Sequence, residues 1–250
     1  MDPATFPPLP RSRRAEFTTT HWSVVLAAGG GENTEASSAL ERLCRTYWYP
    51  LYAYVRRRGY GPADAEDLTQ EFFARLFARD YIARADPAKG RFRAFLLSGM
   101  NHLLSHERDK AHRLKRGGAV QVISLDQVDA EKRYALEPAD RLTAERVFEK
   151  NWATTLLDGA ARRLREEYVG AGKRDLYDQL NDFRLEAPER PSYAEVAARL
   201  GQSESAVKSA IWRLRRRHQE LVRAEIAQTL GDAADVDDEI RYLLRVVASG

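Results

Sequence analysis

The sequence contains a single cysteine, Cys44, among 250 residues. One thiol excludes an internal disulfide framework and fits a reducing compartment, and its apolar neighbours favour a small core residue over a nucleophile. No apolar run is long enough to span a bilayer, and the Pro- and Arg-rich residues 1–16 lack the apolar core of a signal peptide. We therefore expect a cytoplasmic protein that has a disordered N-terminal tail and does not associate with membranes.

Patterns of common catalytic sites are also missing. Nothing resembles a P-loop, a nucleophile elbow or a paired-carboxylate site, and GAGK at 170–173 lacks the glycine spacing and preceding strand of a phosphate loop. His102 and His106 have a spacing that can share a metal, but Glu107 does not complete a zinc-peptidase pattern and no clear third ligand is present. We expect no enzyme activity, no catalytic residue, no metal and no cofactor. One zinc ion per molecule in the purified protein would instead favour an enzyme.

Strand-like alternation of apolar and polar residues is absent, whereas apolar residues recur at helical spacing. We therefore expect an all-α fold of two small helical domains joined by a linker, with a helical C-terminal extension. Pro50 conflicts with a helix predicted over 36–58 and predicts a kink or break there. The predicted divisions are a tail with a short helix (1–35), a first domain (36–117), a linker (118–150), a second domain (151–230) and an acidic extension (231–250).

Charge is unevenly distributed, although the net charge is only +3. Residues 89–116 and 199–223 are strongly basic, whereas the residues after 224 are mostly acidic. Two basic segments in separate regions indicate two contacts with a polyanion such as nucleic acid. Two solvated surfaces are the alternative, which the clustering of the charges disfavours.

Residues 191–217 predict two helices separated by a tight turn. Ser192 and Glu195 have capping-box spacing at the start of the first helix. A DNA-reading helix-turn-helix needs a small residue, a turn glycine and a packed β-branched residue, and the matching positions here hold Ala197, Gly201 and Val207. An ordinary helical hairpin with a solvated basic face is the alternative, and the pattern favours DNA binding.

Residues 64–78 predict a helix with a wide apolar stripe and an acidic opposite side. The acidic side is formed by Asp64, Glu66, Asp67, Gln70 and Glu71. Acids are favoured near a helix N-terminus by the helix dipole alone, so capping explains them as well as docking of a basic partner helix does.

Together these segments resemble bacterial sigma factors of the extracytoplasmic-function group. DAEDLTQEFFARLF at 64–77 resembles the part of sigma domain two that docks on the clamp helices of the largest polymerase subunit. GRFRAFLLSGMNHLLSHERDKAHR at 90–113 resembles the segments that melt promoter DNA and read the minus ten element. PSYAEVAARLGQSESAVKSAIWRLRRR at 191–217 resembles the helix-turn-helix of domain four, which reads the minus thirty-five element. The resemblance covers residues 40–223, and domain three is missing, as in this group.

The resemblance implies a sigma factor that binds core RNA polymerase, with domain four at the flap of the second-largest subunit, and that directs promoter recognition and opening. It implies polymerase contacts at Asp64, Asp67, Gln70 and Glu71. The implied DNA contacts of domain two are Arg91, Arg93, Asn101, His102, Ser105, Arg108, Arg113 and Lys115. Those of domain four are Ser203, Ser205, Lys208, Ser209, Arg213 and Arg216, and Arg215 and Arg217 also suit phosphates. The expected partners are core polymerase, promoter DNA, and an anti-sigma factor or other regulator.

Some features depart from the family pattern. Phe95 stands where the family usually has a tryptophan in the promoter-melting helix, residues 168–191 are longer than usual, and Trp212 stands in the reading helix, where it would pack or stack. The acidic extension would cover a basic surface of its own chain, bind a regulator or add a helix to domain four. Its charge, opposite to that of the reading helix, motivates a hypothesis of autoinhibition.

A second function also fits the sequence: a helix-turn-helix regulator with an all-helical sensor domain that does not engage polymerase as a sigma factor. The acidic helix distinguishes the two functions, because only a sigma factor needs it for polymerase. Charge reversal at Asp67 and Glu71 is the corresponding test.

Overall fold

A computed structural model describes residues 34–77, 91–113, 127–136, 142–184, 191–230 and 236–248. These ranges contain helices and no strand, so the predicted all-α class is confirmed for them. The elements are α2 (Thr34–Arg57), α3 (Pro62–Leu76), α5 (Phe92–Arg113), α6 (Gln127–Ala135), α7 (Ala144–Gly170), α8 (Arg174–Leu180), the 3₁₀ turn η2 (Asn181–Phe183), α9 (Tyr193–Leu200), α10 (Glu204–Thr229) and α11 (Val236–Ala248). The short helix predicted within 1–35 lies outside the described residues. None of the described helices has the length and apolar character needed to cross a membrane.

The chain divides into two compact units. Among the described residues, 156–226 form unit 1, and all others form unit 2. The divisions fall inside α7 and α10, so each of these helices contributes to both units. The chain therefore leaves unit 2 after residue 155 and returns to it with residue 227, which places α11 in unit 2.

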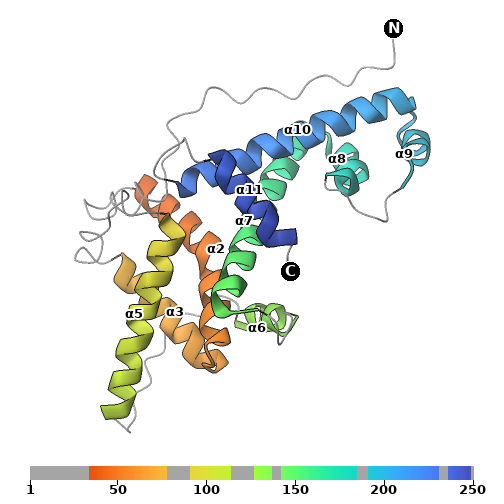
Figure 1. Ribbon diagram of the computed structural model, residues 1–250. Helices are drawn as coiled ribbons and strands as arrows, with labels where there is room; N and C mark the ends of the chain where they lie inside the picture. The colour runs from red at the N-terminus through yellow and green to blue at the C-terminus, as the bar shows by residue number, and fades with distance from the viewer. Residues whose placement is uncertain are drawn as a thin grey trace. The chain divides into compact units, whose positions relative to one another are not determined.

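Unit 2 is built on α2, which packs against α3, while α3 also packs against α5 (Figure 1). Tyr47 of α2 meets Phe92 of α5 edge to face, with ring centroids 5.5 Å apart, and Phe72 of α3 is buried in the same unit. Pro50 lies inside α2, and the helix continues to Arg57 without the predicted break. Tyr47 and Leu51 on either side of Pro50 are both fully buried, so core packing on both sides of the proline offsets its missing backbone hydrogen bond.

Part of the predicted linker is folded. α6 packs against α2, and its Glu131 accepts hydrogen bonds from the Tyr52 hydroxyl at 2.6 Å and from the Arg56 guanidinium at 2.7 and 3.1 Å. The first turns of α7 also fall within the predicted linker, and Phe148 there is fully buried. The attachment of α6 thus includes a carboxylate, and a search for apolar periodicity does not detect such a contact.

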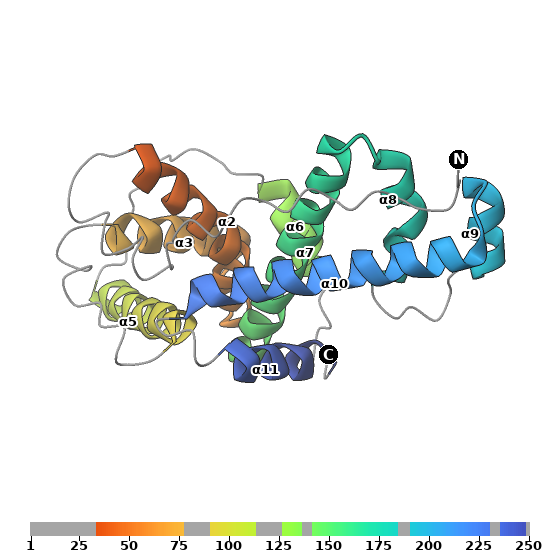
Figure 2. The same ribbon diagram turned by 90° about the horizontal axis from the view of Figure 1, so that it is seen from above.

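Unit 1 has a separate core, made of the second half of α7, α8, η2, α9 and most of α10. Its fully buried centre contains Leu164, Leu180, Val196, Val207 and Leu214. Figures 1 and 2 both show α9 beside the N-terminal end of α10. The apolar residues of α10 recur every three or four positions, which turns one side of the helix inward and leaves the other for solvent.

Candidate nucleic-acid interface

The turn between α9 and α10 is fixed by local chemistry. Ser192 and Glu195 form the predicted capping box: the Glu195 amide donates to the Ser192 hydroxyl at 3.2 Å, and the Ser192 amide donates to the Glu195 carboxylate at 2.7 Å. α9 ends at Gly201, whose φ of 61° lies in the left-handed region that favours glycine. The Ser203 hydroxyl then accepts from the Ala206 amide at 3.3 Å at the start of α10.

α10 presents an exposed stripe opposite its buried side. Val207, Ile211 and Leu214 face the core of unit 1. The exposed stripe is formed by Ser205, Lys208, Ser209, Trp212 and Arg216. Four of the six residues predicted to read DNA therefore lie together on it, and a fifth, Ser203, is exposed just before the helix, where its hydroxyl lies 3.0 Å from that of Ser205. The sixth, Arg213, is half-buried.

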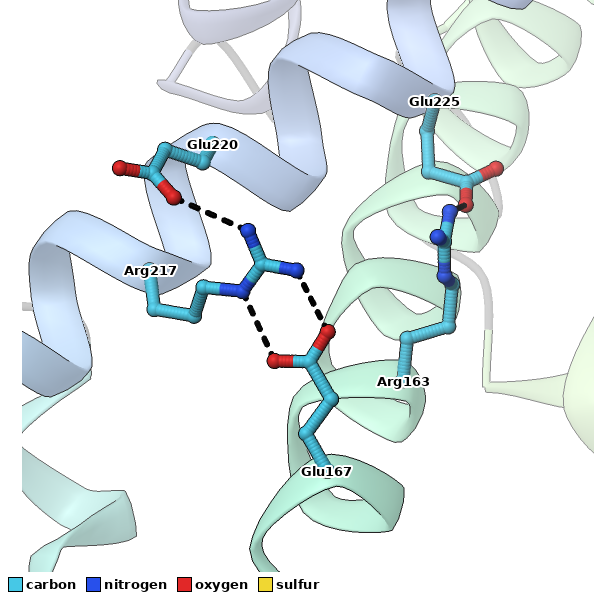
Figure 3. Close-up of polar contacts among 5 residues, drawn as sticks. All are labelled: Arg163, Glu167, Arg217, Glu220 and Glu225. Carbon is cyan, nitrogen blue, oxygen red and sulfur yellow. Dashed lines mark hydrogen bonds and ion pairs between the residues drawn. The ribbon is translucent and has the colours of Figure 1, made fainter. Parts of the chain in front are cut away.

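The arginine run at 213–217 does not form one surface. Figure 3 shows Arg217 between two carboxylates: its guanidinium donates to Glu167 of α7 at 2.6 and 2.8 Å and to Glu220 at 2.9 Å. Arg215 donates to the carbonyl of Phe183 at 2.7 Å. These two arginines join α10 to α7 and η2, so they serve the fold of unit 1 rather than the phosphate contacts for which their charge alone suits them.

Lys208 and Arg216 have weaker partners. Lys208 lies 3.8 Å from Glu204, and Arg216 lies 3.3 Å from Glu220, both one helical turn away. Exposed pairs at this spacing stabilise a helix by only about 0.3–0.5 kcal/mol. Both cations can therefore exchange these carboxylates for a phosphate at little cost.

The predicted acidic side of α3 reaches the surface except at Glu66, which is buried. Asp64 and Asp67 are exposed, and Gln70 and Glu71 are partly exposed on the same side of the helix. Glu71 is paired with Arg75 at 2.5 Å. Glu66 differs from the others, because it is buried, and its burial, followed by the neighbouring charge of Asp67, raises its pKa. The helix thus presents a surface that is acidic over two turns.

The residues of α5 that are predicted to contact DNA differ in their exposure to solvent. His102 and Ser105 are exposed, and the His102 and His106 rings lie 4.6 Å apart. Asn101 is half-buried, and its side-chain oxygen accepts a hydrogen bond from the Tyr54 hydroxyl at 2.6 Å. The side chains of Arg108 and Arg113, and the whole of Lys115, lie outside the described residues. Among the described residues, no three potential metal ligands come together.

Arg91 and Arg93 are not free in this structure, because the acidic extension contacts them. Glu239 of α11 is fully buried and lies 2.7 Å from the Arg91 guanidinium, and it is also paired with Arg93. Only 7% of Arg93 is exposed. In this structure Arg93 therefore presents almost no charge to solvent, and its predicted contact with DNA stays a prediction.

Aromatic rings complete the enclosure of Arg93. Its guanidinium carbon lies 4.7 Å from the ring centroid of Trp152 and 4.6 Å from that of Tyr242, distances at which a cation is attracted to the ring face. Burial, and then the charge of Arg91, lowers the pKa of Arg93. Glu239 was missed by sequence reasoning, although the pattern of buried residues Val236, Glu239 and Leu243 places an acid on the inward side of α11.

The described contacts of α11 thus lie with the start of α5 and with α7, inside unit 2. The acidic extension therefore covers Arg91 and Arg93 of its own chain, which lie in the first predicted domain (36–117). Autoinhibition through the reading helix stays an untested hypothesis.

Comparison with known proteins identifies one part of the chain. Residues 43–113, which contain most of α2 together with α3 and α5, match the family model Sigma-70 region 2. The chain therefore contains a domain of the type that supports polymerase binding and promoter recognition in sigma factors. No curated protein and no solved structure matches the chain significantly.

Proposed function

We propose that this protein is a sigma factor of the extracytoplasmic-function group, which binds core RNA polymerase and directs promoter recognition and opening in the cytoplasm. The observation that carries the proposal is the Sigma-70 region 2 match over residues 43–113, which contains the exposed acidic side of α3. The protein itself performs no chemistry in this mechanism, because polymerase synthesises the RNA.

In the proposed complex, Asp64, Asp67, Gln70 and Glu71 dock on the clamp helices of the largest polymerase subunit. The exposure of this side of α3 supports the assignment, since a docking surface has to be accessible before the partner arrives. An acidic surface also steers a basic partner toward the correct orientation.

The same unit captures the unpaired promoter strand. The exposed His102 and Ser105 of α5 provide imidazole and hydroxyl groups for bases, and the basic residues that follow, among them Arg108, Arg113 and Lys115, neutralise phosphates. Arg91, which directly precedes α5 and has 37% of its side chain exposed, adds a further cation near the start of this helix. Arg93 and Asn101 hold α5 in place beneath this DNA-binding surface through their contacts with Glu239 and Tyr54.

Unit 1 acts as sigma domain four, with α9 and α10 as its helix-turn-helix and its docking partner at the flap of the second-largest subunit. The capping box, the left-handed glycine and the exposed stripe of α10 support this assignment. Ser203, Ser205, Lys208, Ser209 and Arg216 are the proposed DNA contacts, with Arg213 at the edge of the stripe.

Reconstitution of the full-length protein with core RNA polymerase tests the proposal. The wild-type protein should bind core polymerase and start transcription at sites that share upstream sequences. The double variant Asp67→Lys, Glu71→Lys should lose polymerase binding and keep duplex binding. Asp129→Lys is the matched control, because Asp129 is an exposed acid on α6, outside the proposed docking surface.

Two results would contradict parts of the proposal. One is polymerase binding that survives the charge reversal on α3, which would mean that the assignment of this helix as the docking surface is wrong. The other is a wild-type protein that binds duplex DNA specifically and never binds core polymerase, which would overturn the sigma-factor assignment and favour the helix-turn-helix regulator.

A further inference from the structure

Trp212 is an apolar side chain on the otherwise polar exposed stripe of α10. Trp212 is 59% exposed. The aromatic residues in the core of unit 1 differ from it, since each is at most 5% exposed: Tyr168, Tyr177 and Phe183. The core does not need this indole, because Ile211 and Leu214 already fill the inward side of the same turn. An exposed tryptophan at such a position indicates a contact with a partner.

The neighbours of Trp212 indicate the chemistry of that partner. Lys208 lies one helical turn before it, and Arg216 lies one turn after it, with its guanidinium carbon 5.4 Å from the centroid of the Trp212 ring. Ser209 is exposed on the same side. The indole ring of Trp212 therefore lies between two cations. This arrangement fits a ligand in which an apolar group lies between two anionic groups.

Duplex DNA has this arrangement in its major groove. The phosphates line the edges of the groove, and the only apolar group on its floor is the 5-methyl group of thymine. A tryptophan in the third turn of a helix that enters the groove is long enough to meet that methyl group while the flanking cations hold phosphates.

We propose that Trp212 packs against the 5-methyl group of one thymine in the promoter duplex, between phosphates held by Lys208 and Arg216. This inference rests on the proposed function of α9 and α10 as a helix-turn-helix and adds a specificity contact to it. Arg215 and Arg217 do not compete for these phosphates, because they are bonded to Phe183 and Glu167.

Duplexes containing deoxyuridine test the proposal, because replacement of thymine by uracil removes only the methyl group. The probes are double-stranded oligonucleotides selected from a random pool by the full-length protein bound to core polymerase. Each thymine in the selected upstream element is replaced in turn. The wild-type complex should lose about fourfold in affinity at one position, the factor that corresponds to one buried methyl carbon, and little at the other positions.

Trp212→Ala should lower the affinity for the unmodified duplex and bind the thymine and uracil duplexes equally at that position. Trp212→Phe, which keeps an apolar ring, should retain part of the discrimination. Arg216→Ala should weaken binding to all duplexes by a similar factor and keep the preference for thymine. Val169→Ala is the matched control, because Val169 is an exposed apolar residue of unit 1 on α7 and should leave binding unchanged.

The outcomes separate this inference from the function on which it rests. It is overturned if Trp212→Ala keeps the same preference for thymine as the wild type, or if no thymine position is sensitive in the wild type. It is also overturned if Trp212→Ala weakens polymerase binding alone, because the partner of the indole is then a protein. If the Lys208→Ala and Arg216→Ala variants also bind every duplex as the wild type does, the helix-turn-helix assignment itself fails.

Discussion

Glu239 near the C-terminus lies against Arg93 at the start of α5, and both side chains are closed off from solvent. The two residues are far apart in the sequence, and their pairing attaches α11 to the domain that contains the Sigma-70 region 2 match. A buried carboxylate and a buried guanidinium are each costly alone, so each one requires the other. The acidic extension is therefore part of the structure of unit 2.

Replacement of Glu239 tests this attachment. Glu239→Gln keeps the shape of the side chain and leaves the Arg93 charge buried without its partner, so the free energy of unfolding should fall by about 3–5 kcal/mol. Urea denaturation followed by tryptophan fluorescence is a suitable measurement, because Trp152 lies against Arg93.

Asp238→Asn is the control for this change. Asp238 is on the same helix but exposed, and it lies 3.1 Å from Arg241, so its loss should cost less than about 1 kcal/mol. Equal stability of the two variants would mean that the buried pair does not hold α11 in place.

Much of the fold follows from local patterns in the sequence. The helix predicted over 64–78 matches α3 (Pro62–Leu76) to within two residues at each end, and the capping box and turn glycine mark both ends of α9 as the structure has them. Glu131 and Glu239 could not be placed in the same way. Each is a single acid whose partners lie about 75 to 150 positions away in the sequence, and helical periodicity carries no information about pairing over such distances.

Glu131 gives a direct test of whether α6 belongs to unit 2 or to a linker. Glu131→Gln removes the charge that Arg56 contacts at 2.7 Å and weakens the bond from Tyr52. The pair is partly exposed, so we expect a loss of about 1–2 kcal/mol in the free energy of unfolding.

Asp129→Asn on the same helix is the comparison for Glu131→Gln. Asp129 is 72% exposed and lies 3.8 Å from Lys132, so its replacement should have almost no effect on denaturation. If neither variant changes the denaturation curve, α6 does not contribute to the stability of unit 2.

The arginine run illustrates what composition alone misses about the candidate site. A basic cluster predicts contact with a polyanion, but only the packing of α10 decides which arginines face inward. Arg217 reaches Glu167 because α7 lies alongside (Figure 3). Arg216, in contrast, lies on the exposed stripe with Trp212. Adjacent residues on a helix point about 100° apart, so neighbours of equal charge acquire different roles.

Arg216 and Arg217 should therefore respond differently in DNA binding. Arg216→Ala should weaken duplex binding at every sequence and reduce the slope of log affinity against log salt by about 1, since one phosphate contact is lost. Arg217→Ala should leave that slope unchanged and lower the stability of unit 1 through the loss of its bonds to Glu167. Affinities measured between low and physiological salt test this difference, and an equal change of slope in both variants would contradict the assigned roles.

His218 gives unit 1 a dependence on pH. It is 4% exposed, and its Nε2 lies 3.0 Å from the Arg184 guanidinium, so this nitrogen accepts and the ring proton is on Nδ1, on the side of its bond to the backbone of Leu157. Burial, and then the charge of Arg184, lowers the pKa of His218 to about 4. The unfolded chain, with the ordinary histidine pKa of about 6.5, binds this proton more readily than the folded chain does.

The free energy of unfolding should therefore keep the His218 contribution above about pH 6.5 and lose it as the pH falls toward 4, by at most about 1.4 kcal/mol per pH unit. His218→Gln keeps a polar side chain without a titrating group, so the difference in stability between wild type and variant should shrink over this window. Gln219→Ala is the control, because Gln219 is an exposed residue without a titrating group next to His218 on α10, and its replacement should leave the pH dependence unchanged. Urea denaturation of the three full-length proteins between pH 4 and pH 7.5 gives the comparison, and parallel curves for wild type and His218→Gln would show that His218 is not held neutral by the fold.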